Sequence, residues 1–232
     1  MKGAGVIGVV AGSGLDLEPL LDEREEVVTF DEAFGLGHAG IEGRFVRGTC
    51  GGIPMVVQSG RRHFYEGYDF GEVVRTVDFL AESGVSTAVF TNAAGGLSRT
   101  MKAGDLMSAR RLLRWPCRLW PDCPESMEPD FVLEGAAHEG AYLWIHGPTY
   151  ETKAEIRALE AMDAAAVGMS TMPELWRSRE LGVRAAVVSC ITNNCFEQQV
   201  LTHEHVIETA RRASERLRAV IRAALATIAS AI

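Results

Sequence analysis

Three pairs of residues in the C-terminal half of the chain each follow a short apolar run and carry side chains that suit ligand binding. The pairs are Tyr150–Glu151, Met169–Ser170 and Thr192–Asn193. The Glu151 carboxylate only accepts hydrogen bonds, whereas the Asn193 amide offers two donors and an acceptor. A heterocycle with a ring N–H group beside a carbonyl satisfies both side chains. We therefore expect a site for a flat polar heterocycle where the three pairs meet.

A second set of residues, in the N-terminal half, is suited to binding an anion. In Gly12, Ser13 and Gly14 the glycines let consecutive backbone N–H groups face an anion, and the Ser13 hydroxyl adds a donor. Residues 60–68 (GRRHFYEGY) contain arginines, a histidine and tyrosines between glycines. Such side chains are seldom buried in a hydrophobic core and are common in binding sites on loops. Taken alone, the first stretch also fits an ordinary turn and the second a solvated loop.

The apolar runs predict the elements that position these residues. Ala141–Ile145, Ala164–Val167 and Val183–Ile191 alternate with two helix-like segments, a pattern typical of strand–helix–strand crossovers in a parallel sheet. The carboxyl ends of parallel strands open on one edge, where ligands bind. Each helix begins with a capping box directly after a polar pair: Thr152 with Glu155, and Thr171 with Glu174. The pairs should therefore converge on one pocket.

The rest of the chain fits the same α/β class. Further strands are expected at Val6–Ala11, Glu26–Phe30, Gly43–Gly48, Ile53–Gln58 and Thr87–Phe90, and helices at Val73–Gly84 and Val206–Ile228. This alternation predicts one domain over residues 1–232, with a mixed central β-sheet flanked by helices. Residues 98–138 are expected to be irregular apart from a strand at Asp105–Leu113.

The composition argues against several classes of protein. The net charge of −8 argues against nucleic acid as a partner, because proteins that bind it present basic surfaces. The first residues lack the apolar region of a signal peptide, and Ala223–Ile232 is too short to span a bilayer, so we expect a cytoplasmic protein with no membrane partner. Five irregularly spaced cysteines are expected to be reduced. The cysteines and histidines lack zinc-ligand spacing, so no metal is expected.

Five motifs occur in an order that resembles one family. They are GSGL at 12–15, GHAG at 37–40, GRRHFYEGY at 60–68, TNAAGGL at 91–97 and the run from Gly147 to Asn193. Together they resemble the purine nucleoside phosphorylases, in the trimeric branch that includes the methylthioadenosine phosphorylases. Five ordered matches are far more specific than one glycine motif.

The resemblance implies a reaction in which phosphate attacks the anomeric carbon of a purine nucleoside, releasing the purine and ribose 1-phosphate. Inorganic phosphate is then a co-substrate, and no other cofactor is implied. The implied phosphate-binding residues are Ser13, His38, Arg61, His63, Ala93 through its amide, and Ser170. The residues implied to contact the ribose are Tyr65, Met169 and His203. Those implied to contact the base are Tyr150, Glu151, Val167 and Asn193. The residues implied in catalysis are Asn193, Glu151 and His63.

Two positions bear on the substrate that the resemblance implies. Asn193 points to a 6-oxopurine nucleoside such as inosine or guanosine, and His203 to a free 5′-hydroxyl. Phosphorolysis of methylthioinosine or methylthioadenosine is the nearer alternative. A non-catalytic nucleoside-binding protein is the second, because residues 98–138 are shorter than in typical members and Asp16 replaces a usual glycine near the anion site.

The family also implies a homotrimer. In trimeric members the region corresponding to residues 98–138 supplies an aromatic side chain that covers the ribose of a neighbouring subunit. Trp115, Trp120 and Phe131 are the candidates for that position here.

Overall fold

The computed structural model describes residues 5–35, 43–116, 123–197 and 202–230. The first half of the described chain contains β1 (Val6–Val10), β2 (Glu23–Thr29), α1 (Phe30–Phe34), β3 (Arg44–Cys50), β4 (Ile53–Ser59), α2 (Phe70–Glu82) and β5 (Val85–Gly96). The second half contains β6 (Leu106–Arg114), β7 (Ser126–Met127), β8 (His138–Trp144), α3 (Lys153–Ala161), β9 (Ala164–Gly168), α4 (Met172–Glu180), β10 (Arg184–Asn194) and α5 (His203–Ser230). Short 3₁₀ turns lie at Glu18–Leu20 and Phe64–Glu66.

The main strands form one mixed sheet in the order β10-β6-β8-β9-β5-β1-β4-β3-β2. Because β5 also pairs with β10, the strands β5, β10, β6, β8 and β9 close into a ring from which the other four extend. The expectation of three mutually parallel strands is wrong for β10. β8 and β9 are parallel, but β9 runs antiparallel to β5, whereas β10 runs parallel to β5.

Ring closure is the reason that the polar pairs still meet. Gly95 of β5 pairs with Val167 of β9 on one side and with Asn193 of β10 on the other. The ends of β9 and β10 therefore reach the same point of β5 from opposite directions. The meeting of the three polar pairs depends on this closure, and the parallel strands β1, β4, β5 and β10 bring further residues to the same place.

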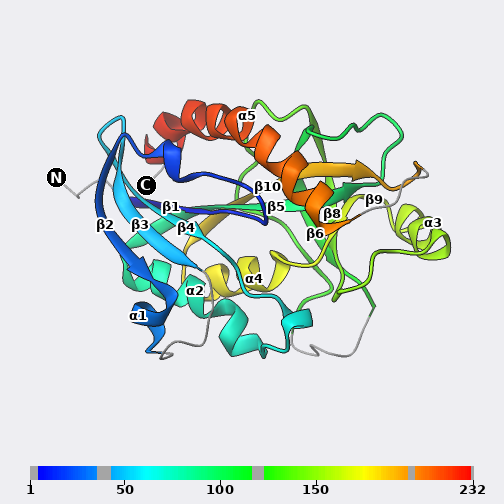
Figure 1. Ribbon diagram of the computed structural model, residues 1–232, viewed down its shortest axis with the longest axis horizontal. Coiled ribbons are helices and arrows are strands. Elements are labelled where there is room, and N and C mark those ends of the chain that lie inside the picture. The colour runs from blue at the N-terminus through cyan, green and yellow to red at the C-terminus, as the bar shows by residue number, and fades with distance from the viewer. Residues whose placement is uncertain (1–4, 36–42, 117–122, 198–201, 231–232) are drawn as a thin grey trace.

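Helices cover the sheet on both faces (Figure 1). The long α5 lies on one face, where its apolar side packs on β1, β4 and β10. On the other face, α2 and α4 pack beside each other on a core that includes Phe90 and Met107. Asp69 and Glu72 form a capping box at the start of α2, as Thr152 and Glu155 do for α3.

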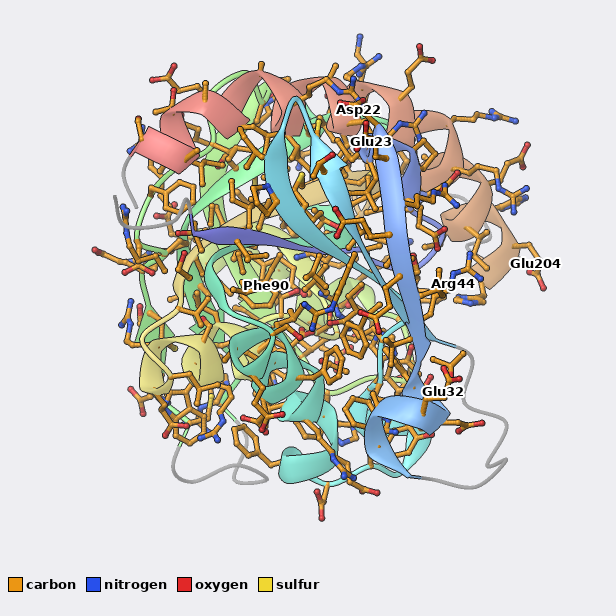
Figure 2. The ribbon with its side chains drawn as sticks, turned by 90° about the vertical axis from the view of Figure 1, so that its left-hand side faces the viewer. Asp22, Glu23, Glu32, Arg44, Phe90 and Glu204 are labelled. Carbon is orange, nitrogen blue, oxygen red and sulfur yellow. The ribbon has the colours of Figure 1, made fainter. Side chains whose placement is uncertain are left out.

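The outer edge of the sheet is β2, which is almost entirely exposed and rich in charged residues. Figure 2 shows this strand running from Asp22 and Glu23 at one end to α1, which carries Glu32, at the other. Charged side chains on an edge strand oppose pairing with another sheet. In the same view Glu204, at the start of α5, points away from the body of the molecule.

The bounds of two elements matter for the site. β5 extends beyond the strand expected at Thr87–Phe90, through the small residues 91–96, and β10 pairs with it along that length. α5 begins at His203, and the His205 N–H donates to the Thr202 hydroxyl at 3.3 Å, as a helix-capping threonine does. Among the described residues, no helix is long and apolar enough to cross a membrane.

Candidate active site

A cavity of about 400 Å³ lies where the ends of β1, β4, β5, β8, β9 and β10 meet the start of α5. It is lined by every site residue predicted from the sequence except His38, which lies outside the described residues. These lining residues are Ser13, Arg61, His63, Tyr65, Ala93, Tyr150, Glu151, Val167, Met169, Ser170, Asn193 and His203. Residues distant in sequence thus share one hollow.

Arg61 is the most tightly held side chain of the cavity wall. Its Nε forms a buried ion pair with Glu174 Oε1 at 3.0 Å, and its Nη1 donates to the Thr91 carbonyl at 2.9 Å and to Ser170 Oγ at 3.2 Å. Its Nη2 is buried and has no hydrogen-bond partner among the described residues. A guanidinium fixed on one side, with donors to spare on the other, suits a bidentate anion.

Ser170 is presented by an unusual turn. Thr171 has a φ of 78°, and the Met172 N–H donates back to the Ser170 carbonyl at 3.0 Å, so the turn is a γ-turn with positive φ. Such a conformation is strained for a non-glycine residue and persists where its surroundings hold it. Here Asn92 Nδ2 donates to the Thr171 hydroxyl at 3.0 Å, and the Thr171 N–H donates to Glu174 Oε2 at 2.9 Å.

Tyr142 supports the same turn from inside the core. Its hydroxyl donates to the Ser170 carbonyl at 3.0 Å, and burial raises its pKa to about 12. The phenol therefore stays protonated near neutral pH and holds Ser170 as a neutral donor.

The turn after β1 is held against β5. The Gly12 N–H donates to Thr91 Oγ1 at 3.1 Å, and that hydroxyl donates to the Val10 carbonyl at 2.7 Å. A Cβ at position 12 would lie 2.6 Å from the Asn92 Cα, so only glycine allows this approach. Ser13 thereby reaches the cavity. Asp16, by contrast, is exposed and does not line the cavity, so its charge does not face the ligand space.

His63 and Tyr65 form a second patch on the same wall. Their rings stack with centroids 4.8 Å apart, and the His63 Nδ1 lies 3.5 Å from Glu66 Oε1. Partial burial works against ionisation of Glu66, but the hydrogen bonds with His63 outweigh it and lower the Glu66 pKa. The His63 main-chain N–H also donates to Glu66 Oε2 at 2.8 Å, so Glu66 holds His63 in place.

Glu151 and Asn193 line the same cavity. Glu151 makes no hydrogen bond to another described side chain, and burial raises its pKa above the ordinary value. Asn193 is oriented by its neighbours: the Thr192 hydroxyl donates to Asn193 Oδ1 at 3.1 Å, and Asn193 Nδ2 lies 3.8 Å from the Cys195 Sγ. An Nδ2 hydrogen is therefore left for a ligand. Tyr150 covers this end and is 41% exposed.

Small and flexible residues line the rest of the cavity. Ala93 lies on β5, Val167 and Met169 lie at the end of β9, and His203 is the first residue of α5. The Met169 Sδ would be 2.4 Å from a Cβ at Gly147, whose φ is +79°. Glycine at position 147 therefore lets the methionine lie across the cavity. The described residues include no group of three or more potential metal ligands.

The sequence indicated the residues at the cavity surface but missed two of those behind them. Glu174 was expected only as a helix cap, yet it also holds Arg61. Thr91 was read as part of a glycine-rich stretch, although it ties the Gly12 turn to β5. Neither role has a local sequence signal, because each partner lies more than 70 residues away along the chain.

Comparisons with known proteins point to one family. Residues 6–226 match the phosphorylase superfamily. Purine nucleoside phosphorylase from Bos taurus is 33% identical, over 96% of this chain and 89% of its own. Purine nucleoside phosphorylase 1 from Bacillus subtilis is 32% identical, over 89% of this chain and 86% of its own.

Solved structures agree with these sequence matches. A schistosome purine nucleoside phosphorylase in complex with hypoxanthine superposes with a TM-score of 0.79 at 26% identity, covering 93% of this chain and 88% of its own. Further structures of the Schistosoma mansoni enzyme, in complex with adenosine and with inosine, match with a TM-score of 0.76 each. The chain belongs to the purine nucleoside phosphorylase family, whose members are pentosyltransferases.

Proposed function

We propose that this protein catalyses the phosphate-dependent cleavage of inosine and guanosine, and of their deoxy forms, to the free purine and (deoxy)ribose 1-phosphate. The observation that carries the proposal is one cavity that is lined both by anion donors and by a carboxylate and an amide. A nucleoside held in this cavity places its anomeric carbon next to the bound phosphate. Bringing the two reactants together in this way supplies much of the rate enhancement.

Phosphate is proposed to bind Ser13, Arg61, His63, Ser170 and the Ala93 amide. The unpaired Nη2 of Arg61 supports this assignment, because a buried donor without a partner is costly until a ligand occupies it. The bound dianion stabilises the positive charge that develops on the sugar as the glycosidic bond breaks. His38, by resemblance, adds a further phosphate contact. Phosphate serves as co-substrate, and the proposal needs no other cofactor.

The base is proposed to bind between Glu151 and Asn193, with Tyr150 and Val167 against its faces. Ionised Glu151 accepts the ring N–H of a 6-oxopurine. The Thr192 hydroxyl donates to Asn193 Oδ1, so the amide turns its Nδ2 toward the purine, where the hydrogen not directed at Cys195 donates to N7 and the amide also faces the 6-carbonyl. A donor at N7 stabilises the negative charge on the leaving base, and loss of such a donor costs about 3 kcal/mol of barrier. The 6-amino group of adenosine is itself a donor and would face the Asn193 Nδ2 donor. This arrangement favours inosine and guanosine over adenosine.

The ribose is proposed to lie against Tyr65 and Met169, with His203 binding the 5′-hydroxyl. The position of His203 at the first residue of α5, on the cavity wall, supports that contact. A methylthio group in place of the hydroxyl cannot accept a strong hydrogen bond from the imidazole. The proposed preference is therefore for a 5′-hydroxyl nucleoside.

We also propose a homotrimer, by analogy with the branch that the motifs resemble. Of the aromatic candidates for covering a neighbour's ribose, Trp115 packs beside Leu143 and Leu159, and Phe131 lies under Arg184. Trp120 falls outside the described residues. Analytical ultracentrifugation tests the proposal: a single species of three chains supports it, and a monomer contradicts it.

The test of function is a spectrophotometric assay of inosine, guanosine, adenosine and methylthioadenosine, each with and without phosphate. The proposal predicts cleavage of inosine and guanosine that requires phosphate, with slower cleavage of the other two. Cleavage of methylthioadenosine alone would overturn the substrate assignment. Ligand-dependent shifts in Tm without any product would identify a binding protein instead.

A further inference from the structure

A bulge in β10 directs Thr192 and Asn193 into the cavity together. Ile191 pairs with Ala94 and Asn193 with Gly95, so Thr192 has no partner on β5. In a regular strand, successive side chains point to opposite faces, and an extra residue breaks that alternation. Both Thr192 and Asn193 line the cavity as a result. Without the bulge, only one of the two would face the ligand.

Asn194 follows the bulge and turns its side chain away from the cavity. Its Nδ2 donates to the Ser98 carbonyl at 3.0 Å and to the Met101 carbonyl at 2.9 Å, and its Oδ1 accepts from the Phe196 N–H at 3.0 Å. The residue is only 5% exposed. Both amide hydrogens are thus used on carbonyls of the loop after β5, and the amide oxygen accepts from the loop after β10.

The main chain on both sides of Asn194 joins the same attachment. The Cys195 N–H donates to the Gly96 carbonyl at 2.9 Å, and the Glu197 N–H donates to the Asn194 carbonyl at 3.1 Å. This register brings the Cys195 Sγ to within 2.6 Å of where a Cβ on Gly95 would lie. It also brings that sulfur beside Asn193 Nδ2. The end of β10 is therefore locked to β5 just beyond the residue that faces the base.

We propose that Asn194 is a positioning residue for the reaction: it locks the β10 bulge so that the Asn193 amide is aimed at the base. The inference builds on the proposed function, since it gives Asn193 its role at the purine. A shorter side chain at position 194 removes the donor to the Met101 carbonyl, leaves the Ser98 carbonyl with only the Met101 N–H, and releases the loop. Asn194→Asp keeps the shape but sets a carboxylate against both carbonyls.

The test is a double-mutant cycle of Asn193→Ala and Asn194→Ala, with inosine turnover and hypoxanthine binding measured for all four proteins. If Asn194 acts through Asn193, Asn194→Ala lowers kcat about ten-fold when Asn193 is present and less than about two-fold when it is absent. Hypoxanthine Kd should show the same coupling. Asn194→Asp should resemble Asn194→Ala. Ser178→Ala, which removes a buried hydrogen bond at the far end of α4, should lower Tm and leave kcat unchanged.

Equal losses of kcat and of hypoxanthine affinity in both backgrounds would overturn the proposal and make Asn194 a purely structural residue. The two readouts separate the inference from the function. If the wild type binds hypoxanthine but cleaves no nucleoside, the proposed function fails and the cycle in Kd still decides the role of Asn194. If it neither binds nor cleaves, both are refuted.

Discussion

The two ends of the cavity are held in different ways. At the anion end, Arg61 and Glu174 have side chains 3% and 1% exposed and share hydrogen bonds with Thr91, Ser170 and Thr171. At the base end, Tyr150 is 41% exposed, and Glu151 makes no hydrogen bond to another described side chain. Preorganised donors act on charge without reorganisation during the reaction. The anion end is thus built in advance of its ligand, whereas at the base end Asn193 is already held by its neighbours and Glu151 gains a partner only with the ligand.

Arg61→Met should cause the largest loss, because it affects both stability and chemistry. It leaves the Glu174 carboxylate buried without its cation, which costs about 3–5 kcal/mol of unfolding free energy. It also removes the proposed phosphate clamp, which should lower kcat/KM about 10³-fold. Thermal unfolding and phosphorolysis assays measure the two effects. Arg61→Lys keeps the charge and should recover part of the stability; a fully active Arg61→Met would refute the clamp.

Glu151→Gln should act at the base end alone. The amide presents an N–H where the carboxylate accepts, so kcat/KM for inosine should fall about 10²-fold. The KM for phosphate and the Tm should stay near the wild-type values, because no described side chain depends on Glu151 for a hydrogen bond. Steady-state kinetics with each substrate varied in turn supply the measurement. A loss of phosphate affinity equal to the loss for inosine would mean that the two ends are not separate.

Glu174→Gln should disturb the anion end without touching the ligand. The glutamine can still cap α4, but it replaces the ion pair with a weaker neutral hydrogen bond and holds Arg61 less firmly, so the KM for phosphate should rise about ten-fold while that for inosine changes little. Glu180→Gln is the matched control on the same helix, where the glutamate pairs with Arg177 near the surface. That control should cost under about 1 kcal/mol and leave kinetics unchanged. Equal effects of the two variants would contradict the positioning role of Glu174.

The pH dependence of kcat/KM for inosine should reflect the ionisation of Glu151 at the base end. Burial raises the Glu151 pKa, so this carboxylate gains its proton at a higher pH than an exposed glutamate does. Since the ionised form is the acceptor for the base, kcat/KM for inosine should fall as the pH drops through that raised pKa. In Glu151→Gln this acid limb should disappear. An identical limb in the variant would assign the titration to another group.

Much of the cavity surface could be predicted from sequence, because its residues stand in motifs beside strand ends. Arg61 in GRRHFYEGY and Asn193 after an apolar run are examples, and both line the cavity. The supports behind them could not be predicted. Glu174 is 113 residues from Arg61, and the pairing of Gly95 with both Val167 and Asn193 depends on ring closure. Such long-range contacts leave no mark on local periodicity.

The account depends on phosphate and nucleoside reacting with each other inside one cavity. The direct measurement is ³¹P NMR of wild-type protein incubated with inosine and inorganic phosphate, with hypoxanthine followed in the same sample. The account predicts that ribose 1-phosphate appears in equal amount to hypoxanthine and that neither forms without phosphate. Hypoxanthine released together with free ribose, at a rate independent of phosphate, would contradict it.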